Sequence, residues 1–378
     1  MTGPKPPLEP FHAVEINRLA HARARSGLDV IHMEVGEPSA GAPAPALAAA
    51  ARSLRGGRLG YWYSDALKER IASHYAGWYG VSVAPERIVL TPGASGALLL
   101  AFTVLFRAGE RVALGRPGYP AYRNVLKALG MEPVEIPCGP LTRYQPTAAM
   151  LEALTPAPAG LVVASPANPT GTMLSRDDLG ALAAACRRLS IPLISDEIYH
   201  GITYGERAAS VLEVERDAIV INSFSKYWCM TGWRLGWLVS PPGLAEEMMS
   251  YAGNIFLTPS TLAQHAALAA MDAHEELAAH LDTYAANRRL VMDSLASIGI
   301  TRVAPADGAF YVYADIGHLT DDSLGFCKRL LADTGVAFNT GLDFDPVEGH
   351  RTLRISFAVS AAETAEAMAR FGRWLSSR

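Results

Sequence analysis

The sequence predicts an α/β protein with a large, mostly parallel sheet flanked by helices and a smaller α+β domain. Short Val-, Ile- and Leu-rich runs, such as residues 218–221, are typical of strands buried on both faces of a parallel sheet. Helical segments separate these runs, as in an α/β fold. Near the C-terminus, residues 309–314 and 351–357 alternate like strands of a smaller domain. A length of 378 residues fits two or three domains, or one large α/β domain with a satellite.

The expected elements alternate along the chain. An amphipathic helix over residues 11–25 precedes a short strand at 30–35 and two helices at 47–54 and 66–79. The strands expected in the large sheet are residues 87–91, 111–114, 161–164, 192–195, 218–221 and 235–239. Further helices are expected at 97–106 and 177–189, and two long ones at 251–271 and 275–295. We expect the last helix to connect the two domains.

Composition argues against several classes of function. The net charge is −4 and the chain has no basic block, so neither nucleic acid nor an anionic membrane is an expected partner. Four scattered cysteines without a C-x-x-C pair, and ten histidines without ligand spacing, predict no disulfide framework and no metal site. The N-terminus lacks an apolar signal segment, and the longest apolar run is too short to span a bilayer. We therefore expect a cytoplasmic protein without a membrane partner.

The most informative stretch is residues 223–236, which lies between two predicted strands and contains Lys226. A lysine enclosed by hydroxyls and aromatic rings is costly to bury as an ammonium but not as a neutral amine. Arg234 follows eight positions later, with Gly232 and Gly236 beside it. A reactive lysine near a fixed cation suggests a carbonyl cofactor that also carries an anion, for which pyridoxal phosphate is the obvious candidate. A solvated lysine on a loop between two strands is the alternative.

Two other strand ends carry features that suit the same cofactor. Residues 92–96, Pro-Gly-Ala-Ser-Gly, join a strand to a helix, and the bare N–H groups of such a turn bind phosphate. Many strand-to-helix turns are glycine-rich only for fit, so this turn alone decides little. Tyr119 follows another strand, held between Gly118 and Pro120. Its ring could stack on a cofactor or simply pack the turn.

Polar side chains follow two more strands. Asn168 stands between two prolines in a segment, residues 165–171, that is also a good turn sequence. Asp196 ends an apolar strand and needs a partner, which a protonated pyridine nitrogen would provide, although it could equally cap a helix. Tyr199 lies three residues after Asp196 and could reach the same site.

These turns are expected to meet in space. The turn at Gly93 and residues Tyr119, Asn168, Asp196 and Lys226 each follow a separate predicted strand. The carboxyl ends of parallel strands lie along one edge of the sheet, where ligands bind. Five separate turns that supply phosphate donors, a ring, an acid and a lysine are hard to explain by packing alone.

The chain resembles the class I and II aminotransferases, pyridoxal-phosphate enzymes of fold type I similar to aspartate aminotransferase. The resemblance rests on Ser-x-Ser-Lys with an arginine eight residues after the lysine, and on Asn168-Pro-Thr-Gly. It covers roughly residues 35–357. It implies transfer of an amino group from an amino acid to a 2-oxo acid through a Schiff base between pyridoxal 5'-phosphate and Lys226.

The resemblance also implies roles for single residues. Lys226, Asp196 and Tyr199 would be catalytic, with Lys226 moving the proton between the substrate Cα and the cofactor. The implied cofactor ligands are Ala94, Ser95, Tyr119, Asn168, Asp196, Tyr199, Ser223, Lys226, Arg234 and Tyr61. The implied substrate contacts are Gly36, Asn168 and Arg354, the last binding the α-carboxylate.

The resemblance implies a homodimer whose active site is shared between subunits. A tyrosine near residue 61 would cross to the partner's cofactor phosphate, and either Tyr61 or Tyr63 could be that residue. The implied organisation is an N-terminal segment, 1–45, that joins the small domain, a large cofactor domain, 46–275, and a C-terminal small domain, 276–378.

Two other classes of function fit part of this pattern. Another pyridoxal-phosphate enzyme, such as a C–S lyase, racemase or decarboxylase, would share nearly all of this site. A non-catalytic transcription regulator would carry an added N-terminal DNA-binding domain, for which the segment before Gly36 leaves no room. Residues 95–106 contain no basic residue to bind a distal carboxylate, which favours apolar or aromatic amino acids as donors, although a lysine or arginine elsewhere in the fold could serve.

Overall fold

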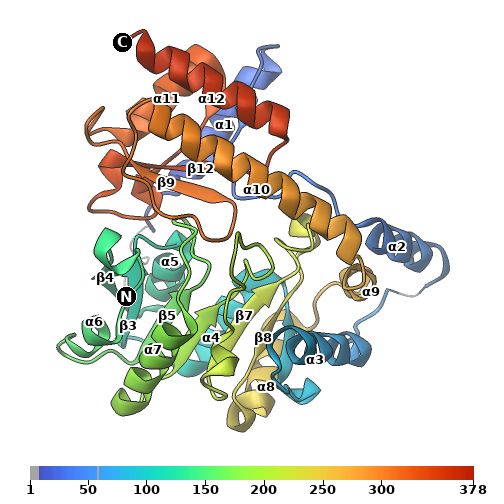
Figure 1. Ribbon diagram of the computed structural model, residues 1–378. Helices are drawn as coiled ribbons and strands as arrows, with labels where there is room; N and C mark the ends of the chain where they lie inside the picture. The colour runs from blue at the N-terminus through green and yellow to red at the C-terminus, as the bar shows by residue number, and fades with distance from the viewer. Residues whose placement is uncertain (1–7, 58) are drawn as a thin grey trace, which may run out of the picture.

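A seven-stranded sheet forms the centre of the protein (Figure 1), described here from a computed structural model that covers residues 8–57 and 59–378. The strand order is β2-β8-β7-β6-β5-β3-β4. The strands are β2 (Ile88–Thr91), β3 (Arg111–Arg116), β4 (Glu132–Pro137), β5 (Gly160–Ala164), β6 (Leu193–Asp196), β7 (Ile219–Ser223) and β8 (Gly236–Val239). Strands β3 to β7 pair in parallel, which confirms the predicted α/β class.

Strand β8 corrects one expectation. Residues 235–239 were expected to form a parallel strand, but β8 runs antiparallel to both of its neighbours, β7 and β2. The connection from Ser223 to Gly236 contains only a single 3-10 turn, Thr231–Trp233. A parallel return needs a longer crossover, usually with a helix, so the chain turns back directly.

Helices cover both faces of this sheet because its strands are apolar on both sides. In β7, Ile219 and Ile221 pack on one face and Val220 on the other. The first face is covered by α4 (Gly93–Leu105), α5 (Pro120–Leu129) and α8 (Ala245–Phe256). The second is covered by α3 (Asp65–Tyr79), α6 (Ala148–Glu152) and α7 (Arg176–Leu189).

The predicted long helix at 251–271 is two helices. Helix α8 ends at Phe256, and α9 (Thr261–Ala270) begins after Pro259 and Ser260. Leu257 has a φ of 62°, and the Ser260 side chain accepts a hydrogen bond from the Ala263 N–H, so the break has a cap of its own. Helix α2 (Ala44–Gly56) packs against α9 at one side of the molecule (Figure 1).

A second group of strands and helices lies above the large sheet in Figure 1. Its three-stranded antiparallel sheet has the order β11-β12-β9, formed by β9 (Tyr311–Asp315), β11 (Asn339–Thr340) and β12 (Thr352–Ser356). A separate parallel pair joins β1 (Ile31–His32) to β10 (Val336–Ala337), so the N-terminal segment lies with the C-terminal one. The helices of this group are α1 (His12–Arg25), α10 (His274–Ser297), α11 (Ser323–Thr334) and α12 (Ala361–Ser376).

The long helix α10 links the two groups, as expected for residues 275–295. None of the helices in the described part of the chain is long and apolar enough to cross a membrane. Strands β2, β3, β5, β6 and β7 all run in one direction, so their carboxyl ends share one edge of the sheet. The second sheet faces that edge, and the space between them contains the candidate site.

Candidate active site

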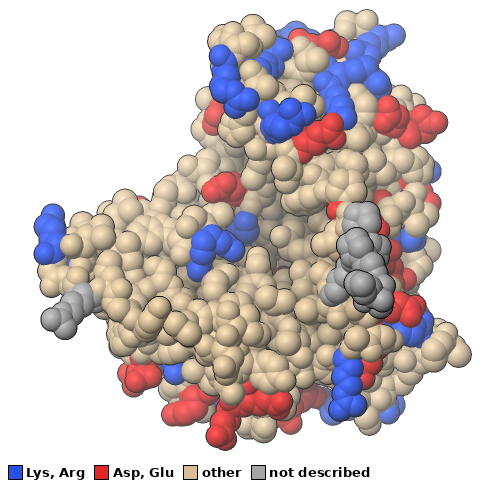
Figure 2. Space-filling view, turned by 180° about the vertical axis from the view of Figure 1, so that it is seen from behind, with Lys and Arg blue, Asp and Glu red and all other residues tan. Residues whose placement is uncertain are grey.

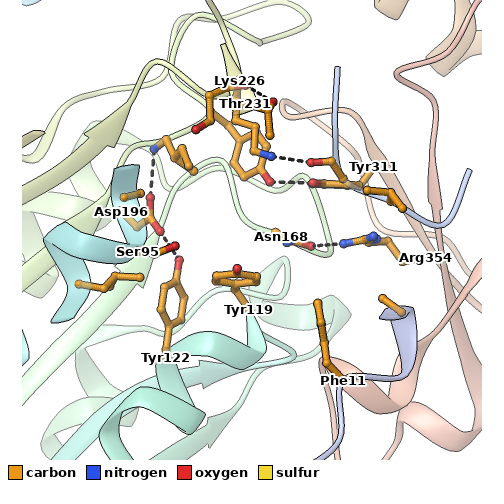
Figure 3. A pocket seen from close by; sticks show the side chains of 18 of the residues that line it. Phe11, Ser95, Tyr119, Tyr122, Asn168, Asp196, Lys226, Thr231, Tyr311 and Arg354 are labelled. Atoms are coloured by element: carbon orange, nitrogen blue, oxygen red, sulfur yellow. Dashed lines mark hydrogen bonds between the residues drawn. The ribbon is translucent and has the colours of Figure 1, made fainter. Parts of the chain in front are cut away.

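A cavity of about 350 Å³ lies between the carboxyl edge of the large sheet and the smaller sheet (Figure 3). Most of the predicted site residues line it, and they are Gly36, Ala94, Ser95, Tyr119, Asn168, Asp196, Tyr199, Lys226, Arg234 and Arg354. They come from segments that are far apart in sequence. The expected convergence of strand ends therefore occurs in the folded chain. Ser223 and Tyr61 are not among the lining residues.

Lys226 projects into the cavity three residues after the end of β7. Its Nζ donates a hydrogen bond to the Gly36 carbonyl oxygen at 2.5 Å and lies 5.9 Å from the centre of the Phe310 ring. Burial lowers the pKa of the Lys226 amine to about 8, an effect that the nearby Glu37 carboxylate opposes. A substantial fraction of this amine is therefore neutral near physiological pH, as a nucleophile must be.

Asp196 lines the same cavity and is the last residue of β6. It is buried, and its carboxylate accepts hydrogen bonds from the Tyr122 hydroxyl at 2.5 Å and the Ile198 N–H at 3.1 Å. Burial raises the pKa of Asp196 to about 6, while the Tyr122 hydrogen bond acts in the other direction. The carboxylate is therefore largely ionised at neutral pH and remains able to pair with a cationic ring nitrogen.

Arg354 supplies a buried cation on the side formed by the smaller sheet. Its guanidinium donates to the Asn168 side-chain oxygen at 3.1 Å and to the Glu34 carbonyl oxygen at 2.5 Å, and it stacks 4.5 Å from the centre of the Tyr311 ring. The residue is only 3% exposed, and its Nε has no hydrogen-bond partner. Among the residues described, no carboxylate forms an ion pair with it. A buried guanidinium with a spare N–H is suited to binding a ligand carboxylate.

The first turn of α4 and Arg234 form an anion-binding corner. Helix α4 begins at Gly93, so the predicted glycine-rich turn is the helix N-terminus, where Ala94 and Ser95 line the cavity. A Cβ on Gly93 would lie 2.6 Å from a guanidinium nitrogen of Arg234, and Gly93 has a φ of +72°. The positive φ favours glycine here, and the missing side chain leaves space for the guanidinium to approach. The arginine and the helix N-terminus thus face the same small volume, which suits a phosphate.

Of the two serines before Lys226, Ser225 is among the residues that line the cavity and Ser223 is not. Ser223 is fully buried, and its Oγ donates to the Leu235 carbonyl oxygen at 3.0 Å and lies 2.7 Å from the Ser225 Oγ. That Ser223 is a direct cofactor ligand therefore stays a prediction. Ser223 faces the start of β8, because the chain turns back there, and it holds Ser225 at the cavity.

The two tyrosines considered for the subunit crossing have different surroundings. Tyr63 donates a hydrogen bond through its hydroxyl to the Leu257 carbonyl oxygen at 2.5 Å, within the same chain. Tyr61 is 82% exposed and does not line its own cavity. Of the two, Tyr61 has the side chain that is available to another molecule.

Several lining residues were not expected. Tyr311 bonds through its hydroxyl to the Tyr199 hydroxyl at 2.7 Å, and Tyr122 holds Asp196. Tyr122 could have been found, because it follows Tyr119 by three positions at the start of a helix and both therefore share a face. The others are Phe11, Ala13, Val14, Asn17, Glu34, Val35, Leu98, Ile198, Ser225 and Thr231. Those on α1 depend on docking of the N-terminal segment, for which no local pattern exists.

Comparison with known proteins shows the family to which the chain belongs. The profile of the family described as aminotransferase class I and II matches residues 29–371, which is most of the chain. The chain belongs to this family. The aminotransferase resembles "Valine--pyruvate aminotransferase" of Mycobacterium tuberculosis, with 48% identity over 98% of this chain and 97% of the relative. It is 31% identical to "Aspartate/prephenate aminotransferase" of Thermus thermophilus, over 97% of both chains.

A solved structure gives the same result for the fold. The crystal structure of an aminotransferase from Mycobacterium tuberculosis superposes with a TM-score of 0.97 and 47% identity, over 100% of each chain. The predicted fold type I architecture is therefore confirmed. The family depends on pyridoxal 5'-phosphate, and this is the cofactor of the aminotransferase.

The cavity fits this cofactor. It offers an amine for the aldehyde at Lys226 and a carboxylate for the ring nitrogen at Asp196. It also offers a cationic corner for the phosphate, where Arg234 approaches Gly93 so closely that a side chain at position 93 would contact the guanidinium. Tyr119 lines the same cavity with its ring (Figure 3). These groups match the three chemically distinct parts of the cofactor.

Removal of the Tyr122 hydroxyl should make cofactor retention more sensitive to acid. The hydrogen bond from Tyr122 lowers the pKa of Asp196, so Tyr122→Phe should raise that pKa above its present value of about 6. During acidification Asp196 would then become protonated at a higher pH than in wild type. Cofactor binding should weaken about tenfold near pH 6 as a result. Retained cofactor absorbance after gel filtration across a pH series measures this. Tyr119→Phe, which leaves the Tyr122 bond intact, is the control, and identical pH profiles for the Tyr122 variant and wild type would contradict the assignment.

Proposed function

We propose that this aminotransferase moves the amino group of an α-amino acid with an apolar side chain to a 2-oxo acid, using the residues of this cavity in the roles below. The observation that carries the proposal is Arg354, a buried cation with a spare N–H that faces the same cavity as Lys226. Every α-amino acid and 2-oxo acid has a carboxylate for such a group. The remaining wall is largely apolar and includes Phe11, Val14, Leu98 and Ile198.

The relative of 48% identity supports this choice of substrates, since it is named for valine and pyruvate. Lys226, Arg234 and Arg354 are the lysine and arginines among the described lining residues, and each has a role in holding cofactor or α-carboxylate. No further cation in this chain's described lining is left for a second carboxylate. Valine and pyruvate are therefore the first pair to test.

The reaction uses each group in turn. When bound, pyridoxal phosphate supplies an aldehyde that amines can join and a ring that accepts the electron pair left at the substrate Cα. Arg354 binds the α-carboxylate and orients the substrate. Lys226 Nζ would hold the aldehyde carbon of the cofactor at rest and, once the substrate amine has taken its place, would carry the proton between the substrate Cα and that aldehyde carbon. Asp196 keeps a proton on the ring nitrogen, so the ring remains able to accept that electron pair.

Other residues hold the cofactor in place. Asn168 and Tyr199 donate hydrogen bonds to its phenolic oxygen, and Tyr311, whose hydroxyl bonds to that of Tyr199, positions it. The backbone of Ala94 and Ser95, with Arg234, binds the phosphate. Tyr119 stacks on the ring, and Gly36, whose carbonyl accepts from Lys226, borders the substrate.

A donor and acceptor screen tests the reaction. Twenty amino acids are incubated with pyruvate, 2-oxoglutarate or oxaloacetate, and both products are quantified. Transamination gives one new amino acid for each amino acid consumed and needs the acceptor. Release of ammonia and pyruvate without an acceptor would instead indicate lyase chemistry.

We also propose that the protein is a homodimer. In each subunit, residues 46–275 would form the large cofactor-binding domain, and residues 1–45 would join residues 276–378 in the small domain. Exposed large apolar side chains gather on α2, the following loop and α8, and they are Leu47, Leu54, Leu59, Tyr61, Trp62, Tyr251, Ile255 and Leu257. Figure 2 shows a broad face without charged side chains between the arm that carries α2 and the centre of the molecule. An apolar area of this kind is typical of a protein interface.

Hybrid dimers should reveal whether Tyr61 serves the partner's site. Tyr61→Ala should weaken cofactor binding about tenfold through loss of one phosphate contact. Mixed with Lys226→Ala, it should regain activity at limiting cofactor, because each hybrid contains one complete site, giving about a quarter of wild-type sites at random mixing. Tyr63→Ala, whose hydroxyl is used within its own chain, is the control. Hybrids that form without recovering activity would exclude a crossing at Tyr61.

A further inference from the structure

Glu34 is a fully buried carboxylate that lines the active-site cavity and has no place in the reaction described above. Its exposed fraction is 0%, and it stands two residues before Gly36. Its Oε1 accepts hydrogen bonds from the Asn17 side-chain amide and the His32 ring, both at 2.9 Å. Its Oε2 is buried without any hydrogen-bond partner.

The charge at this position is not required for the contacts that Glu34 makes. A glutamine side-chain oxygen could accept from Asn17 in the same way, and an amide costs much less to bury than a carboxylate. An unpartnered buried carboxylate oxygen destabilises the fold, so the charge calls for an explanation other than stability. The partly exposed His32, whose pKa Glu34 raises through their hydrogen bond, offsets this charge only when its ring is protonated.

The position of Glu34 relates its charge to the substrate. Arg354 donates to the Glu34 backbone carbonyl and not to its carboxylate, so a substrate held at Arg354 lies beside Glu34. The wall next to it is formed by α1 through Ala13, Val14 and Asn17, none of which is cationic. A second carboxylate on a substrate would therefore enter a small cavity that already contains a negative charge on this side.

We propose that Glu34 is a specificity-determining residue whose buried carboxylate excludes substrates with a second carboxylate and restricts the enzyme to amino acids and 2-oxo acids with uncharged side chains. This inference rests on the proposed function, in which Arg354 binds the α-carboxylate. Two like charges in a weakly solvated cavity repel strongly enough to change relative affinity by an order of magnitude. Repulsion between charges adds to the effect of the apolar wall, which by its shape alone would discriminate poorly between acidic and neutral side chains of similar size.

The test compares acidic and neutral substrates in wild type and Glu34→Gln. We expect wild type to prefer valine and alanine to aspartate and glutamate, and pyruvate to oxaloacetate. In Glu34→Gln the ratio of kcat/KM for acidic to neutral substrates should rise about tenfold, mainly through the acidic ones. Glu34→Asp should keep the wild-type preference. Glu15→Gln, which removes a charge on α1 that pairs with Lys328 and does not line the cavity, should change nothing.

A binding measurement without turnover accompanies the kinetics. Maleate, with two carboxylates, and isobutyrate, with one, are titrated into the holoenzyme and followed by cofactor absorbance. Glu34→Gln should bind maleate about tenfold more tightly while isobutyrate binding is unchanged. If Glu34→Gln does not fold, Glu34→Ala removes the same charge. It should raise the acidic-to-neutral ratio of kcat/KM and the affinity for maleate relative to isobutyrate.

The outcomes separate this inference from the function on which it rests. Equal use of aspartate and valine by wild type, or an unchanged acidic-to-neutral ratio and unchanged maleate affinity in the neutral variants, would overturn the role of Glu34 while leaving transamination intact. Weaker binding of both maleate and isobutyrate in Glu34→Gln would instead show that Arg354 had been disturbed. That result would also refute a role for Glu34 limited to the second carboxylate.

Discussion

Replacement of Lys226 by alanine should abolish transamination and the covalent attachment of the cofactor. Lys226 is the lysine that lines the cavity in the described part of the chain, and burial keeps its amine partly neutral with a pKa of about 8. The variant loses both the nucleophile that joins the cofactor and the base that moves the Cα proton. Proton transfer by a positioned base alone contributes up to about 10⁴-fold, so kcat should fall by at least that order.

The covalent bond can be tested independently of activity. Borohydride reduction of wild type, followed by peptide mapping, should place the cofactor label on Lys226. The Lys226→Ala protein should carry no such label and should lose the yellow colour of the holoenzyme after gel filtration. Lys127→Ala, at an exposed lysine paired with Glu9, should behave as wild type. A label on any other lysine of the wild-type protein would refute the assignment.

The groups of the site that lie at strand ends were predictable from the sequence. Asn168 and Lys226 lie within a few residues of the ends of β5 and β7, Asp196 is the last residue of β6, and parallel strands bring their carboxyl ends to one edge. Once the strands are recognised, no knowledge of long-range packing is needed to place these residues together. The signal in the sequence was that each of these residues is polar, at a point where a packed core would have apolar residues.

The other groups depend on how distant segments pack. Glu34, Tyr311 and the residues of α1 reach the cavity because the smaller sheet and the N-terminal segment face the large sheet, and no local pattern encodes that docking. The direction of β8 has a different cause. It follows from the tight return after Lys226, which includes a hydrogen bond from the Ser223 Oγ to the Leu235 carbonyl oxygen that sequence periodicity does not reveal.

Replacement of Arg354 by lysine should leave the cofactor in place and remove the recognition of amino acids. Arg354 belongs to β12, the central strand of the smaller sheet, and two of its nitrogens are held by Asn168 and the Glu34 carbonyl. A guanidinium so fixed can bind a carboxylate through two parallel N–H groups, which a lysine ammonium cannot reproduce. A charged, buried hydrogen-bonded pair contributes several kcal/mol, so kcat/KM should fall about a hundredfold or more for every amino acid.

The pattern across substrates distinguishes this role from general damage to the site. Because every amino acid carries the same α-carboxylate, the loss in Arg354→Lys should be similar for valine, alanine and aromatic donors. Simple amines, which lack a carboxylate, should react with the holoenzyme as slowly as before, and borohydride labelling of Lys226 should be unchanged. Arg302→Lys, at a largely exposed arginine paired with Asp315 outside the cavity, is the matched control. If amines lost as much rate as amino acids, Arg354 would be supporting the fold of the site and not binding the carboxylate.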